Sequence, residues 1–174
     1  MFTKHNTSIR IILYSLVLFI LYILQSVPAA GLRFMGVAPE LLLTLTIGIA
    51  FFESETFAAF FGLAAGLLND IVTDSAVGKS AVFFMFAAFI ISMFLQTLLR
   101  NFFLTYIFMT LSVTAVYLVL CYLLAMLVSG YIPIGSALLH VLLPKFFFTG
   151  VLAYPLYFVV RFIHRRLEDG GDTL

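Results

Sequence analysis

Two carboxylates stand four residues apart at the end of an apolar stretch, where charged side chains are rare. Asp70 and Asp74 would share one face if a helix continues through both of them. Two carboxylates this close could bind a cation together, or one of them could keep its proton. Alternatively, Asp74 already belongs to a hydrated turn and Asp70 caps a helix end or pairs locally. A structural ion pair of Asp70 would use Lys79 or Lys145.

Lys145 is the second group that could do chemistry, because it lies in an apolar segment. It follows Pro144, and His140 precedes it by about one helical turn. A proton or ion pathway through a membrane would place such groups facing one another. The simpler interpretation is that Lys145 extends its ammonium group to the outer membrane interface. One Lys and one His without a row of carboxylates favour that simpler interpretation.

The remaining polar residues predict structural roles. Gln25, Ser92 and Gln96 lie in apolar stretches and could form hydrogen bonds between helices. Glu53 and Glu55 lie in a short hairpin loop, where we expect both to be solvated.

The sequence contains no recognisable catalytic constellation. It has no Ser/His/Asp arrangement, no HExxH motif and no phosphate-binding glycine loop, and its three histidines lie in different regions. The single cysteine, Cys121, excludes a disulfide framework and any metal site built from several cysteines. We therefore predict a protein that is not an enzyme, with no catalytic residue, no cofactor and no metal site.

The element that must position Asp70 is an amphipathic helix whose two faces differ in side-chain size. Around residues 57–71, small residues and the polar end fall within an arc of about 140° at helical spacing, and bulky apolar residues fill the rest. Gly62 and Gly66 have the GxxxG spacing, which lets a second helix backbone approach closely. The partner helix belongs either to this chain or to another protein. The small face consists of Ala58, Ala59, Gly62, Ala65, Gly66, Asn69 and Asp70.

The composition indicates that lipid is part of the solvent of this chain. Of its 174 residues, 64% are hydrophobic and only 10% are charged, whereas soluble domains carry about 25% charged residues. The net charge of +1, with no basic block, excludes nucleic-acid binding as a predicted function. The sequence predicts a polytopic membrane protein embedded in a bilayer.

We predict an all-α fold with six transmembrane helices in one integral membrane domain, residues 1–174. A membrane span needs about 20 mostly apolar residues, and short connections leave no room for a soluble domain. Pro144 and Pro155 interrupt the last span. The spans are expected at residues 11–27, 37–52, 56–72, 81–99, 102–128 and 137–160.

The distribution of Lys and Arg predicts that both chain ends are cytoplasmic, an N-in, C-in arrangement. The opposite side then holds only Arg33 and Lys79, with Lys145 inside or near the sixth span. An uncleaved first helix agrees better with this arrangement than a removable signal peptide. The residues on the cytoplasmic side are Lys4, Arg10, Arg100, Arg161, Arg165 and Arg166.

The segment 39–78 resembles the family of the bacterial rod shape-determining protein MreD. Pro39 precedes Glu40 and three leucines, as in the second span of that family. The next span carries Gly62 and Gly66 and ends in Asp70, and a further glycine, Gly78, follows after a turn. The last span also fits, with Pro155 before the basic tail formed by Arg161, Arg165 and Arg166.

This resemblance implies a non-catalytic scaffold of the rod complex in the inner (plasma) membrane of a bacterial cell, supporting peptidoglycan elongation and cell shape. The implied partners are an MreC-like membrane protein, a RodA-type glycosyltransferase and a penicillin-binding transpeptidase, and indirectly MreB. Gly62, Gly66 and Asp70 would form a packing and polar-lock surface. That surface would face MreC or close the chain's own bundle.

The alternative function is that of a substrate-binding membrane subunit of a small-molecule, vitamin-like transporter. MreD-like chains are similar to the six-helix subunits of energy-coupling-factor transporters. Those subunits carry a first helix with spaced alanines, whereas residues 11–19 here are bulky throughout. A binding pocket would also need convergent polar and aromatic groups in the outer loops, in which this sequence is poor.

Overall fold

The structure is a computed structural model, and it describes residues 3–26, 37–73, 77–98, 103–129 and 141–169. Within these ranges the fold is all-α, as predicted, because its regular elements are α-helices. The six helices are α1 (Thr3–Ser26), α2 (Leu41–Phe52), α3 (Glu55–Val72), α4 (Lys79–Leu98), α5 (Phe103–Ser129) and α7 (Leu143–Asp169).

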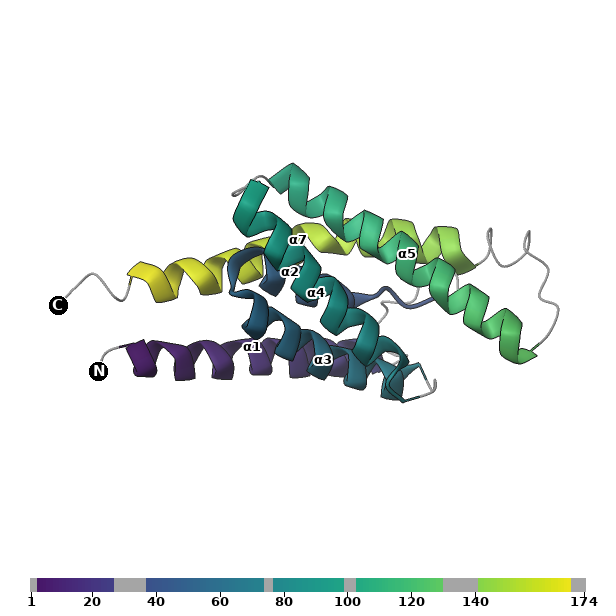
Figure 1. Cartoon of the computed structure of the whole chain (residues 1–174), viewed down its shortest axis with the longest axis horizontal. Helices are drawn as coiled ribbons and strands as arrows, with labels where there is room; N and C mark the ends of the chain where they lie inside the picture. Colours follow the sequence, from purple (N-terminus) through teal and green to yellow (C-terminus); the bar gives the residue numbers. More distant parts are fainter. Residues whose placement is uncertain (1–2, 27–36, 74–76, 99–102, 130–140, 170–174) are drawn as a thin grey trace.

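Four helices are long and apolar enough to cross a membrane, which indicates a membrane protein. They contain the segments Ile9–Ser26, Glu55–Val72, Phe103–Val128 and Leu143–Arg166. Two shorter apolar segments, Leu41–Phe52 and Lys79–Leu95, accompany them. Figure 1 shows that successive helices alternate in direction, so that α1 begins and α7 ends at the same end of the bundle.

The short helix α2 forms the centre of the bundle. Every residue from Leu41 to Phe51 is buried, and α2 contacts each of the other five helices (Figure 1). A helix that is apolar on all sides is stable only where other elements or lipid surround it completely. The run of leucine, isoleucine and alanine in α2 therefore reflects its place in the bundle interior.

The start of α2 differs from the expected boundary. We expected this span to extend back toward Val37, but the helix begins at Leu41, whose amide donates to the carbonyl of Pro39 at 3.1 Å. Proline disfavours helical geometry in the residue before it, here Ala38. The four residues from Val37 to Glu40 are therefore not helical, and Glu40 occupies the N-cap position of α2.

The last helix also differs from its expected range. It runs from Leu143 to Asp169, well beyond residue 160, and residues 137–140 lie outside the described part of the chain. Pro144 is the second residue of α7, where its missing N–H group costs no helical hydrogen bond. Pro155 lies in the interior of α7 without ending the helix.

Candidate functional site

The small face of α3 packs against α4 of the same chain. A Cβ atom added at Gly62 would stand 2.7 Å from the carbonyl oxygen of Phe84, and one added at Gly66 would stand 2.5 Å from that of Ser80. Ala58 on the same face is completely buried. Glycine is therefore required by close approach of the two helix backbones, and the partner of this face is α4 rather than another protein.

Asp70 caps the N-terminus of α4. Its Oδ1 accepts the backbone N–H of Ser80 at 2.9 Å, and its Oδ2 accepts that of Gly78 at 2.8 Å, while only 1% of the residue is exposed. The first N–H groups of a helix have no partner within the helix, and a carboxylate is stabilised there. Gly78 has a φ of +100°, which favours glycine. Of the interpretations considered above, the structure places Asp70 in the local cap.

In the described part of the chain the structure records no ion pair between Asp70 and either of the cations considered for it, Lys79 and Lys145. Lys79 is the first residue of α4, and within the described ranges the structure records no ion pair for it. Asp74 and His140 lie outside the described residues, so a paired-carboxylate site or a Lys–His pathway has no described geometry.

Asn69, next to the cap, is the centre of a buried hydrogen-bond network. Its Oδ1 accepts from Gln25 Nε2 at 2.8 Å, and its Nδ2 donates to Tyr117 Oη at 2.9 Å and to Ser80 Oγ at 3.3 Å. Ser80 Oγ and Tyr117 Oη are 2.7 Å apart, and Gln25 Oε1 accepts the backbone N–H of Leu42 at 3.3 Å. This Asn69 network connects α1, α2, α3, α4 and α5.

The sequence indicated only part of this network. Gln25 was expected to form a hydrogen bond between helices, and it does so. The sequence predicted that Asn69 lies on the small face but indicated no hydrogen-bond partner for it. Nothing in the sequence indicated that Tyr117 or Ser80 would bond to it. Their pairing depends on three helices meeting at one point, which hydropathy and spacing do not encode.

Lys145 forms an ion pair with Glu40 inside the bundle. The Glu40 side chain is completely buried and that of Lys145 is 18% exposed. Thr149 Oγ joins the two segments, because it accepts the Glu40 N–H at 3.1 Å and donates to the Lys145 carbonyl at 2.7 Å. Lys145 was expected to extend its ammonium group toward the outer interface; the structure adds that this group pairs with a buried carboxylate at the start of α2.

Glu53, at the opposite end of α2, is the centre of a second polar cluster. Its carboxylate accepts Arg10 Nη1 at 3.1 Å and Tyr14 Oη at 3.0 Å and lies 3.3 Å from His164 Nδ1. Its side chain is 7% exposed, so the expectation of a solvated Glu53 was wrong. The carbonyl of Glu53 also accepts Ser92 Oγ at 3.0 Å. This Glu53 cluster holds the α2–α3 turn to α1, α4 and α7.

Opposing effects act on the charge of Glu53. Burial by itself would raise the pKa of this carboxyl group, because it disfavours the charged form. The hydrogen bond to His164, the positive charge of Arg10 and the hydroxyl of Tyr14 together outweigh burial and hold the pKa below its ordinary value. The cluster is therefore built around an ionised carboxylate.

Comparison of the chain with protein families, with curated proteins and with solved structures finds no match in any of the three. The described geometry therefore carries the functional argument alone. Its polar groups connect helices: Asp70 to α4, Asn69 to α1, α4 and α5, Glu40 to α7, and Glu53 to α1 and α7.

Proposed function

We propose that this chain is a non-catalytic membrane scaffold of the MreD type, supporting peptidoglycan elongation and cell shape as a component of the rod complex. The observation that carries the proposal is that the charged residues which could do chemistry are bonded to other parts of the same chain. Asp70, Lys145 and Glu53 are each bonded to another helix or helix end of the same bundle. Groups used in this way fix the positions of helices and hence the shape of the outer surface.

The segment that carries the resemblance to MreD supports the proposal through its architectural role. Pro39 sets the start of the central helix α2, Gly62 and Gly66 allow α3 and α4 to touch, and Asp70 with Gly78 forms the cap of α4. Each residue of this pattern has a physical role in building the bundle. A protein that acts by presenting helices to partners depends on such a bundle.

The contact with rod-complex partners is then expected on the outer faces of the bundle, because α4 already covers the small face of α3. The outer face of α1 presents Ile12, Leu16 and Phe19, which are 65%, 57% and 58% exposed. Their spacing of three and four residues places them on one stripe of the helix. A stripe of this kind suits the apolar helix of an MreC-like membrane protein.

We further propose six membrane spans with both ends cytoplasmic, in the plasma membrane of a bacterial cell. The shorter helices α2 and α4 would complete the four longer spans. Arg10 lies in the first half of α1, and Arg161, Arg165 and Arg166 lie at the end of α7, so these charges share one end of the bundle (Figure 1). The positive-inside rule assigns that end to the cytoplasm.

The decisive experiment is extraction of the tagged chain in mild detergent, with mass spectrometry of all bound proteins and small molecules. The proposal expects an MreC-like protein together with a RodA-type glycosyltransferase and a penicillin-binding transpeptidase. A tagged membrane protein of similar size, extracted in parallel, controls for unspecific co-extraction. Recovery of a transporter module or of a vitamin-like molecule would instead favour the substrate-binding subunit.

A pair of variants locates the partner surface within the same experiment. Leu16→Ala with Phe19→Ala changes the outer stripe of α1, and Leu104→Ala with Phe108→Ala changes an apolar pair on α5 that is even more exposed. We expect the α1 variant to recover several-fold less MreC-like protein and the α5 variant to behave like the wild type. Equal recovery with both variants would show that the α1 stripe is not the contact.

A further inference from the structure

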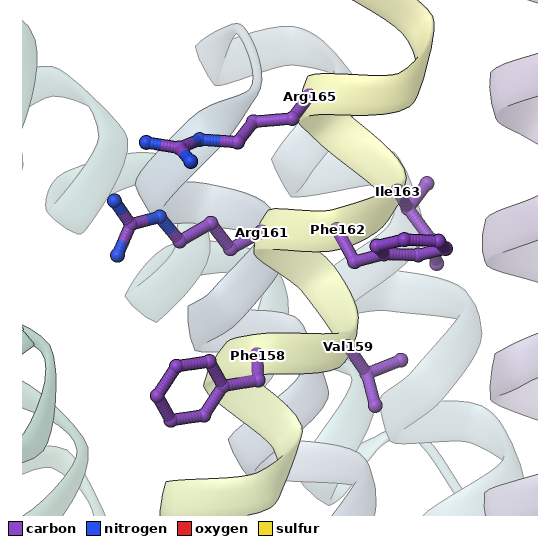
Figure 2. A pocket seen from close by; sticks show the side chains of 6 residues that line it. All are labelled: Phe158, Val159, Arg161, Phe162, Ile163 and Arg165. Carbon is purple, nitrogen blue, oxygen red and sulfur yellow. The ribbon is translucent and has the colours of Figure 1, made fainter.

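The outer side of the C-terminal half of α7 contains a groove in which two arginines lie beside aromatic rings. The groove has a volume of about 610 Å³. Figure 2 shows Arg161 and Arg165 extending from the same side of α7 as Phe158, one turn apart from each other. The lining residues are Phe158, Val159, Arg161, Phe162, Ile163 and Arg165.

The two arginines of this groove differ from the paired cations of the bundle. Arg10 pairs with Glu53 and Lys145 with Glu40, whereas Arg161 and Arg165, like Lys79 and Arg166, have no ion pair within the described part of the chain. Arg161 lies over the ring of Tyr157 at 5.7 Å from its centroid. No ion pair occupies the N–H donors of Arg161 within the described residues, so these donors can bind an anion.

The apolar part of the groove suits a hydrocarbon chain. Phe158, Val159 and Phe162 are 48%, 40% and 59% exposed, and Ile163 is buried. Phe158 extends from the same side of α7 as Arg161 and Arg165, which are one helical turn apart, so an exposed aromatic ring adjoins a row of two guanidinium groups (Figure 2). A phospholipid has this same pairing of parts, a phosphate group joined to acyl chains.

We propose that this groove binds an anionic phospholipid, with its phosphate between Arg161 and Arg165 and an acyl chain against Phe158, one turn earlier in α7. Arginine forms bidentate hydrogen bonds with phosphate oxygens. The arginines also lie in the last two turns of the apolar segment Leu143–Arg166 that can cross a membrane, and we expect that end of a span to lie near the lipid phosphates. A water-soluble acidic peptide would match the charges but would leave the exposed apolar side chains of Phe158 and Val159 uncovered.

The test measures lipids retained by the purified full-length chain. The chain is exchanged into equimolar phosphatidylglycerol and phosphatidylcholine, repurified, and analysed by native mass spectrometry. We expect retention of phosphatidylglycerol in excess over phosphatidylcholine. The variant Arg161→Gln with Arg165→Gln should lose about tenfold or more of that excess, because it removes both guanidinium groups that would form hydrogen bonds with the phosphate.

A matched control separates the groove from the general positive charge of this helix end. Arg165 and Arg166 are adjacent and both exposed, but Arg166 does not line the groove; its guanidinium lies 5.0 Å from the ring centroid of Phe162. Arg165→Gln should reduce retention of phosphatidylglycerol several-fold, and Arg166→Gln should leave it nearly unchanged. Both variants should melt at the wild-type temperature, since neither changes a buried contact.

Four outcomes would overturn the proposal. The first is equal retention of both lipids by the wild-type chain, and the second is equal loss with Arg165→Gln and Arg166→Gln. The third is displacement of the lipid by millimolar inorganic phosphate, which would show that the arginines recognise phosphate without its acyl chains. The fourth is recovery of an acidic peptide in place of lipid, which would assign the groove to a protein partner.

Discussion

The carboxylate of Glu40 and the ammonium group of Lys145 form an ion pair between the start of α2 and the first turn of α7. Glu40 has no exposed surface, and its Oε2 has no hydrogen-bond partner within the described residues. A carboxylate in this environment depends on one cation for its charge balance. The pair therefore makes the position of α7 against the central helix sensitive to a single side chain.

Removing only the cation should destabilise the bundle strongly. We expect Lys145→Met to lower the free energy of unfolding by about 3–5 kcal/mol, because it leaves the Glu40 carboxylate buried without a partner. The double variant Glu40→Gln with Lys145→Met should recover most of that loss. Unfolding in mixed micelles with an increasing fraction of denaturing detergent measures the free energy of unfolding of both variants. If the double variant were as unstable as Lys145→Met, the unpaired charge of Glu40 would not be the cause of the destabilisation.

The close approach of α3 and α4 predicts a different response at two glycines. A methyl group at Gly66 would meet backbone atoms of α4, which cannot move aside locally, whereas one at Gly150 would meet the Cδ2 of Leu111 at 3.0 Å. We expect Gly66→Ala to cost about 2–3 kcal/mol and Gly150→Ala less than about 1 kcal/mol. The melting temperatures of the two variants in detergent, each compared with the wild type, test this difference. Equal melting temperatures would contradict the described helix contact.

Asp70→Asn should lower the stability of the protein even though it keeps the size of the side chain. Both carboxylate oxygens accept backbone N–H groups, from Gly78 and Ser80. An asparagine side chain has only one oxygen, so its NH₂ group would face a donor in one of these positions. We expect a loss of about 1–3 kcal/mol in stability. Amide hydrogen exchange at the start of α4 should accelerate, and unchanged exchange there would argue against the cap.

The Asn69 network predicts a contrast between two buried polar residues. Asn69→Leu removes three hydrogen bonds and leaves Gln25 and Tyr117 short of a partner, so we expect a cost of about 2 kcal/mol. Thr114 on α5 is also buried, but its hydroxyl has no hydrogen-bond partner within the described residues. Thr114→Val should therefore be neutral or stabilising. Detergent unfolding that ranks the two variants in the opposite order would contradict the network.

The Glu53 cluster predicts a loss of stability in acid. The folded-state pKa of Glu53 lies below its ordinary value of 4.5. The contribution of the Glu53 carboxylate to the free energy of unfolding is therefore present above about pH 4.5. It is lost as the pH falls below that value through the folded-state pKa. Melting curves between pH 3 and pH 7 should show a smaller acid-induced decrease for Glu53→Gln than for the wild type. Glu55→Gln, in the same turn, should retain the wild-type dependence.

Hydropathy and side-chain size were sufficient to predict several features. The membrane class and the all-helical fold follow from apolar runs that no soluble fold of this size could bury. The small face of α3 follows from Gly62 and Gly66 at helical spacing. The N-cap role of Asp70 was among the interpretations considered, because a carboxylate before a turn has few partners besides nearby N–H groups. These properties are local, and local sequence encodes them.

Only the tertiary structure decided which groups meet. It placed α4 against the small face, paired Lys145 with Glu40, and enclosed Glu53 between Arg10 and His164. These partners lie far apart in sequence and on different helices. Each pairing forms because packing around α2 removes both groups from water, so that a charge or hydrogen-bond donor finds its partner in the protein or is left unsatisfied. Spacing along one helix carries no information about that choice.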